Sequence, residues 1–218
     1  MRKVLLSLLA LCVVPTVAMS QQADCPNCTM GIFETTDMLQ NFGRFDGQTK
    51  EVFIGVQFDG IEVTGLRGVE FSVYGLDPFF FSYTPDAGAN IVLGDIEAPL
   101  DREDTTGGGM NMAWPTCQVG TNGGFVFGKI TMIALGGAGT VGDDFVLQIE
   151  RKYPPSNLTQ AFPLLNLCDD PTFTPTSLTA SCYVINPTVG PGGIVGGCEL
   201  IGVAVKDAPW SEIKALYR

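Results

Sequence analysis

Histidine is absent from the 218-residue sequence. Its absence excludes Ser-His-Asp and Cys-His catalytic groups, metal sites that need an imidazole ligand, and pH switches based on histidine. Basic residues are also scarce, because 12 lysines and arginines stand against 23 aspartates and glutamates and give a formal net charge of −11. Nucleic acids and anionic membrane surfaces are bound by clustered positive charge, so the composition disfavours both kinds of partner.

Long apolar runs and helical periodicity are missing beyond the first 20 residues. The longest later apolar run, residues 130–135, ends at two glycines and is far shorter than the roughly 18 residues needed to cross a bilayer. Before the last ten residues, no useful stretch has apolar residues at the helical period of 3.6. Glycine and proline are abundant instead, at 27 and 14 residues. We therefore expect a globular, loop-rich chain without a transmembrane segment in its mature part.

The first 20 residues have the features of an export signal. Two basic residues precede an apolar run over residues 4–14, and Ala18 and Ser20 place small side chains before a cleavage point at Gln21. Removal of two basic residues would change the net charge from −11 to −13. A secreted protein is expected, in the extracellular space, at the cell surface or in the periplasm. The expected organisation is a signal peptide over 1–20, one β-sandwich domain over 21–207 and a short tail over 208–218.

The mature chain is dominated by short apolar runs and period-2 alternation, which are typical of strands. In residues 69–73 the alternation places Val69, Phe71 and Val73 on a core face and Glu70 and Ser72 outward. Roughly ten such segments, separated by Gly, Pro and Asp turns, predict an all-β fold of two packed antiparallel sheets. Further expected strands cover residues 52–58, 79–83, 91–96, 125–135, 145–149, 179–185 and 200–205.

One hairpin is expected from turn chemistry. The sequence Asn122-Gly123-Gly124 separates residues 117–119 from the long strand over 125–135. Such a turn suits two neighbouring antiparallel strands. Residues 187–197, rich in glycine and proline, are expected to form a loop or a weak boundary.

Six cysteines remain after the signal peptide, and an even number in an exported chain favours disulfides. Six cysteines allow 15 pairings in principle. We favour two pairs that tie strands already close in the hairpin order. These pairs are Cys117 with Cys168 and Cys182 with Cys198, which leaves Cys25 and Cys28.

Cys25 and Cys28 form a C-x-x-C motif with three interpretations. A redox pair would need a thioredoxin-like βαβ setting, and a zinc knuckle would need a second motif or a histidine. The sequence has neither context. A small N-terminal staple, or two partners for other cysteines, is the favoured interpretation.

Carboxylates gather in one loop and suggest two kinds of site. Oxygen-rich loops suit Ca²⁺, so a structural calcium ion is the one cofactor that the sequence leaves open, although no EF-hand spacing is present. Paired carboxylates also suit glycoside hydrolysis, which depends on their separation in space. The calcium candidates are Asp95, Glu97, Asp101, Glu103 and Asp104.

Aromatic residues offer a glycan-binding alternative. Residues 79–83 hold three consecutive phenylalanines, so at least one ring must point away from a single core face. A strand buried on both sides is favoured, because large exposed apolar patches are uncommon on soluble proteins. Tyr83 and Trp114 are the residues whose substitution would test a carbohydrate-binding face.

The motif Trp114-Pro115-Thr116-Cys117, the pair Leu167-Cys168 and the ending of the chain together resemble a group of secreted bacterial proteins. These are cohesin-like or immunoglobulin-like β-sandwiches with a C-terminal W-S-x-I-K-x-L-Y-R tail. The resemblance implies an architecture and no assigned activity. In the tail, one face of a short helix would carry Trp210, Ile213, Leu216 and Tyr217.

The sequence therefore predicts a noncatalytic secreted β-sandwich for adhesion, surface display or protein-protein contact. Its partner would be a protein or a glycan at the cell surface. A carbohydrate-binding module is the first alternative, and a carboxylate-dependent hydrolase is the second.

Overall fold

The computed structural model describes residues 25–58, 65–99, 107–120, 123–156, 161–170 and 176–201. These residues contain fourteen strands and one short 3-10 helix, η1 (Ala138–Thr140), joined by turns and loops. No helix among them has the length and apolar character to cross a membrane. The strands are β1 (Cys25–Phe33), β2 (Phe42–Gly43), β3 (Thr49–Phe58), β4 (Leu66–Tyr74), β5 (Phe79–Pro85), β6 (Ile91–Asp95), β7 (Gly109–Gln118), β8 (Gly124–Ala134), β9 (Phe145–Glu150), β10 (Leu164–Leu167), β11 (Thr176–Ala180), β12 (Cys182–Ile185), β13 (Ile194–Val195) and β14 (Cys198–Glu199).

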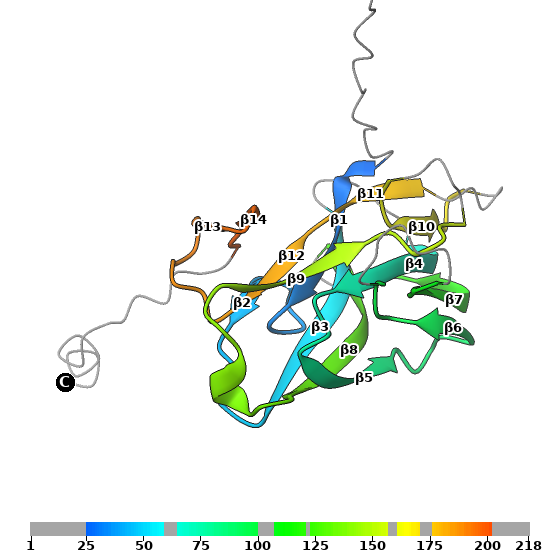
Figure 1. Ribbon diagram of the computed structural model, residues 1–218. Helices are drawn as coiled ribbons and strands as arrows, with labels where there is room; N and C mark the ends of the chain where they lie inside the picture. The colour runs from blue at the N-terminus through cyan, green and yellow to red at the C-terminus, as the bar shows by residue number, and fades with distance from the viewer. Residues whose placement is uncertain are drawn as a thin grey trace, which may run out of the picture.

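The strands form an all-β sandwich of two layers (Figure 1). One layer contains β1, β3, β8 and β5 in that order, with β5 at its edge. In the other layer β4 is central, because β7 lies on one side of it and β10 and β9 share the other side. β11 pairs with both β10 and β1 and so joins the layers.

The core fills the space between the layers with apolar side chains. Trp114 of β7 packs edge to face on Phe125 of β8, with ring centroids 5.5 Å apart. Phe71 of β4 packs on Phe127 of β8 at 5.4 Å. These contacts join strands of opposite layers, as the alternating apolar positions of each strand require.

Most strand pairs are antiparallel, as expected from the sequence, but two pairs are parallel. β1 pairs in parallel with β11, and β2 with β12. The expected strand over 179–185 is also divided at Ser181, where the chain leaves β11 and enters β12. The Ser181 N–H donates to the carbonyl of Met30 in β1, and its carbonyl accepts from Ile149 in β9. Bonds to two different strands explain the break.

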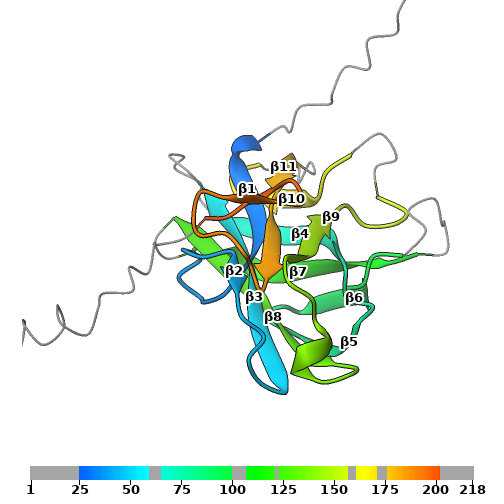
Figure 2. The ribbon, with the colours of Figure 1, turned by 60° about the vertical axis from the view of Figure 1, so that its left-hand side comes forward.

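The predicted hairpin of residues 117–119 with the strand after them is wrong. β7 pairs with β4 and β6, whereas β8 pairs with β3 and β5. β7 and β8 therefore lie in different layers (Figure 2). Trp114 of β7 and Phe125 of β8 thus face each other across the core instead of lying on neighbouring strands of one sheet.

The outward positions of β4 are buried, contrary to the exposure implied by its alternating pattern. Val69, Phe71 and Val73 do lie in the core, yet Glu70 and Ser72 are also buried. The segment after β9 covers this face. Ser72 Oγ donates to the carbonyl of Arg151 at 2.7 Å.

β5 is an edge strand rather than a strand buried on both sides, so that expectation is wrong. Phe79 is buried, but the next ring, Phe80, is 68% exposed. β5 pairs with β8 alone among the described strands, and nothing described covers its outer face. Phe79 packs inward on Phe45 and Phe145.

Three disulfides close the fold. They join Cys117 to Cys168, Cys182 to Cys198, and Cys25 to Cys28, and the first two are the pairs expected from the sequence. Cys25 and Cys28 are both buried within β1, which suits a staple. The second disulfide ties β14 to β12 beside a small apolar cluster around Val184.

Several expectations lie outside the described residues. The signal peptide falls in residues 1–24, and the tail with Trp210, Ile213, Leu216 and Tyr217 falls in residues 202–218. Of the expected strand over 200–205, Leu200 and Ile201 are described and are not in a strand. The glycine-rich loop over 187–197 includes β13, which pairs with β14.

Candidate functional site

A groove crosses the outer face of the layer that contains β4. It has a volume of about 240 Å³, and four strands and one loop line it. We call it the outer-face groove. Its outward side chains and its floor come from Gly68 and Glu70 of β4, Asn111 and Ala113 of β7, Leu164 and Asn166 of β10, Ile91 of β6 and Ser156.

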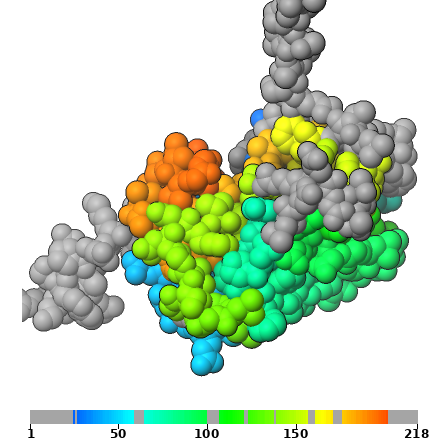
Figure 3. Space-filling model, viewed as in Figure 1, coloured from blue at the N-terminus to red at the C-terminus, as the bar shows by residue number. Residues whose placement is uncertain are grey.

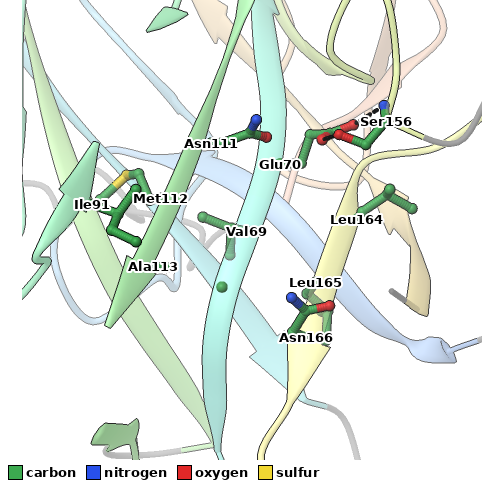
Figure 4. A pocket seen from close by; sticks show the side chains of 11 residues that line it. Val69, Glu70, Ile91, Asn111, Met112, Ala113, Ser156, Leu164, Leu165 and Asn166 are labelled. Atoms are coloured by element: carbon green, nitrogen blue, oxygen red, sulfur yellow. Dashed lines mark hydrogen bonds between the residues drawn. The ribbon is translucent and has the colours of Figure 1, made fainter. Parts of the chain in front are cut away.

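Strand register aligns these residues in two rows across the sheet. The first row runs Ile91, Ala113, Gly68, Asn166, and the second runs Leu93, Asn111, Glu70, Leu164. The first row is hollow in the middle because Ala113 and Gly68 are small. A methyl group on Gly68 would lie 3.3 Å from both the Asn166 amide nitrogen and the Met112 carbonyl. Ile91 and Asn166 stand on either side of the hollow (Figure 4).

Glu70 provides the charge of the groove and is itself held in place. The Ser156 N–H donates to Glu70 Oε1 at 2.9 Å, and the Ser156 hydroxyl donates to Oε2. Only 7% of Glu70 is exposed. A carboxylate with two such bonds is positioned rather than free to rotate.

Amides supply the other polar groups of the groove. Asn111 and Asn166 project from β7 and β10 on either side of β4 (Figure 4). The buried Asn166 Oδ1 has no hydrogen-bond partner among the described residues. An amide offers both a donor and an acceptor, and a peptide group is its natural complement.

β6 forms the rim of the groove and is exposed along its whole length. All five of its residues are exposed, and Ile91, Val92 and Leu93 are exposed by 45%, 39% and 61%. Figure 3 shows the green surface of this region at the right of the molecule. An apolar patch of this kind is characteristic of interaction surfaces.

Of the calcium candidates, Asp95 and Glu97 are described, and Asp101, Glu103 and Asp104 lie outside the described residues. Burial, and then the charges of Asp77 and Asp95, raise the pKa of Glu97. These three carboxylates therefore repel one another at the end of β6. Within the described ranges, no group of three potential ligands is arranged to hold a metal ion.

The two residues proposed for a glycan-binding face lie inside the sandwich. Trp114 is 4% exposed, and its indole N–H donates to Asp86 at 3.0 Å. Tyr83 is half-buried, and its hydroxyl lies 3.0 Å from the sulfur of Met112. Burial, and then the charge of Asp86, raise the pKa of Tyr83. Neither ring is displayed for stacking on a sugar, so these two residues do not form the aromatic face that the glycan-binding alternative requires.

Carboxylates do not converge in the described pockets. The outer-face groove has Glu70, and a second pocket between β9 and the chain before β10 has Glu150. A third pocket, near Met38 and Phe125, has no carboxylate. Glycoside hydrolysis requires a pair of such groups in one cleft. The described pockets therefore lack the arrangement that the hydrolase interpretation needs.

Comparisons with known proteins give structural similarity without sequence similarity. No protein-family model matches the chain, and no curated protein matches it. The solved structures with a similar fold are cohesin modules. One is a cohesin module from a Clostridium perfringens family 33 glycoside hydrolase, at 12% identity and a TM-score of 0.44, covering 77% of this chain and 99% of that one.

Two further cohesins were solved as complexes. The sixth cohesin of Acetivibrio cellulolyticus scaffoldin B, in complex with a Cel5 dockerin mutant, has 13% identity and a TM-score of 0.42 and covers 74% of this chain and 99% of that one. The Clostridium thermocellum complex Coh-OlpC-Doc435 has 12% identity and a TM-score of 0.41 and covers 77% and 98%.

Sequence reasoning missed the groove residues. Asn111 and Ala113 are the outward positions of a strand whose inward positions, Met110, Met112 and Trp114, were recognised as alternating. That alternation was the available signal. Asn166 could not be placed, because its neighbours along the chain do not show which strand it joins.

Proposed function

We propose that the protein is a noncatalytic binding module and that the outer-face groove contacts a protein partner. The observation that supports this most is the composition of the groove. Apolar side chains from Ile91 and Leu164 flank a hollow floor, and two asparagines supply amides. Such a site suits a partner side chain that enters the hollow while the asparagine amides form hydrogen bonds with the peptide groups beside it.

The lining of the groove favours a protein over a glycan or a substrate. No aromatic ring lines it, so the usual stacking platform for a sugar is missing there. Its single carboxylate, Glu70, is engaged by Ser156 and has no second carboxylate opposite it in the groove. The groove would therefore contact another protein. That contact would serve adhesion or surface display.

Site-directed crosslinking tests the proposal. A photoreactive residue is placed at Ile91, on the rim, and at the control position Ile194, which is 72% exposed on β13. Each variant is irradiated with secreted proteins of the source cells. We expect a discrete adduct from Ile91 and none from Ile194, and the adduct is identified by mass spectrometry.

The identified protein is then purified and titrated calorimetrically against the wild type and Ala113→Leu, which fills the hollow. A loss of about tenfold in affinity, equivalent to roughly 1.4 kcal/mol, is expected. Equal affinity for both proteins, or the same adducts from Ile91 and Ile194, would overturn the proposal. Binding on a glycan array that is lost with Asn111→Ala would replace the protein partner with a carbohydrate.

A further inference from the structure

The free edge of β6 lies beside the outer-face groove. β6 pairs with β7 on one side, and no described strand pairs with its other side. An unpaired edge carries backbone N–H and C=O groups that another extended chain can bond. The exposed Ile91, Val92 and Leu93 lie along this edge.

The usual protections of an edge strand are missing from most of β6. Natural edges are blocked by lysine, by proline or by a covering segment. Residues 91–95 contain no lysine and no proline, and no described residue covers them. Its one charged residue, Asp95, stands at the end of the strand, where Gly94 has a positive φ of 98°.

Both ends of β6 are nevertheless held by backbone hydrogen bonds. The Asn90 N–H donates to the Ala113 carbonyl at 3.0 Å, and the Ile96 carbonyl accepts from Val73 of β4 at 2.7 Å. Ala98 then donates to the Val73 carbonyl at 2.8 Å. The exposed edge is therefore preorganised, which lowers the entropy lost when a partner binds.

The negative charge at the end of β6 favours a positively charged partner segment. Asp77, Asp95 and Glu97 lie close enough at the end of β6 for their charges to disfavour ionisation of Glu97. The whole chain carries a net charge of −11. A second copy of this chain would bring the same negative charge to the edge, whereas a basic segment would neutralise it.

We propose that the free edge of β6 accepts an extended segment of the partner protein as an added strand. This segment places apolar side chains beside Ile91, Val92 and Leu93 and a lysine or arginine beside Asp95. Main-chain hydrogen bonds supply affinity, and the alternate side chains supply selectivity. The inference rests on the proposed function, because it specifies the chemistry of the same partner.

Synthetic peptides test the inference on the full chain. The probe is an acetylated octapeptide with four central valines and two lysines at each end, so that in either strand direction valines can lie beside residues 91–93 and a lysine beside Asp95. Its twin has glutamate in place of lysine. A third peptide is the lysine form with alternate amides N-methylated. One edge of this peptide then has no N–H groups to donate hydrogen bonds to β6. We measure affinity by fluorescence anisotropy and protection of residues 91–95 by hydrogen exchange.

The lysine peptide is expected to bind and to slow exchange in β6, while the other two peptides do not. Leu93→Lys and Asp95→Lys are expected to weaken binding by about tenfold or more, since each opposes the apolar or the charge contact. Ile194→Lys, at a position that is 72% exposed on β13, leaves binding unchanged.

Three results would overturn strand addition: no protection of residues 91–95, equal binding of the glutamate peptide, or an equal effect of Ile194→Lys. Ala113→Leu separates the two proposals. If it abolishes partner binding while no peptide protects β6, the groove stands as the contact surface and strand addition fails. If β6 is protected and Ala113→Leu has no effect on the partner, the groove proposal fails instead.

Discussion

Glu70 on β4 accepts a hydrogen bond from the backbone N–H of Ser156 at 2.9 Å and a second bond from the hydroxyl of the same residue, although 86 positions separate them in the chain. This contact folds the segment after β9 over the outer face of β4. It buries a charged side chain and builds one end of the outer-face groove. Stability and site geometry are therefore linked at this pair.

Glu70→Ala is expected to lower the free energy of unfolding by about 1–3 kcal/mol, because the Ser156 donors lose their acceptor in a buried place. Urea denaturation measures the change. Glu51→Ala is the matched control, since its bond to Lys129 at 2.7 Å is exposed and its removal is expected to lower stability much less than Glu70→Ala. Equal effects of the two variants would contradict the role assigned to Glu70.

The three disulfides are expected to contribute in the order of the loops that they close. In the chain-entropy model, serine substitution of Cys117 and Cys168, 51 residues apart, removes about 4 kcal/mol. The same change removes about 3 kcal/mol for Cys182–Cys198, 16 apart, and about 2 kcal/mol for Cys25–Cys28, 3 apart. Denaturation of the three double variants checks the order, and a reversed order would contradict the model.

Glu97→Gln is expected to raise the melting temperature at pH 7. The raised pKa of Glu97, caused first by burial and then by Asp77 and Asp95, means that its ionised form is disfavoured in the folded state. The gain is below about 1 kcal/mol, because the carboxyl is only partly buried. It disappears as pH falls through this raised pKa towards 4.5, where the wild type becomes protonated.

Asp144→Asn supplies a control of opposite sign. Hydrogen bonds from the Thr188 hydroxyl and N–H lower the pKa of Asp144, so its ionised form stabilises the fold above the unfolded pKa. The variant is expected to melt at a lower temperature at pH 7 and to match the wild type at low pH. Melting curves between pH 3 and pH 7 that change in the same direction for both variants would refute the assignments.

Trp114 is expected to act in stability rather than in binding. Trp114→Ala leaves a hole between Phe125 and Phe127 and costs about 3–5 kcal/mol. Trp114→Phe keeps an aromatic ring but removes the bond to Asp86. Phe80→Ala, on the exposed face of β5, is expected to change stability by about 0.5 kcal/mol or less. Thermal melts compare the three, and a larger loss for Phe80 than for Trp114 would contradict the assigned burial.

The outer face of β4 illustrates where sequence reasoning reached its limit. Period-2 alternation placed Val69, Phe71 and Val73 in the core correctly, since alternation is a local property of a strand. It could not show that Glu70 is buried, because the covering residue, Ser156, is distant in sequence. Period-2 alternation predicts which face of the strand a side chain lies on. It does not predict which distant segment covers that face.

The strand after residue 123 illustrates the second limit. Residues 125–135 were recognised as a strand from their length and apolar character, yet the glycine-rich turn before them suggested the wrong neighbour. β8 pairs instead with β3 and β5, whose residues are far from that turn in the sequence. Turn chemistry is local to the residues beside the turn and cannot identify such distant partners.

The sequence by itself determined an all-β sandwich and the positions of most long strands, because alternation and turn residues are properties of the chain alone. The even number of cysteines favoured disulfides but allowed 15 pairings, and the two pairs that were preferred are present in the fold. Tertiary structure decided the rest. It placed Asn111 of β7 and Asn166 of β10 on either side of β4 and left β6 at a free edge. Binding surfaces of a sheet are made by neighbours in register, and register between distant strands is set only when the core packs.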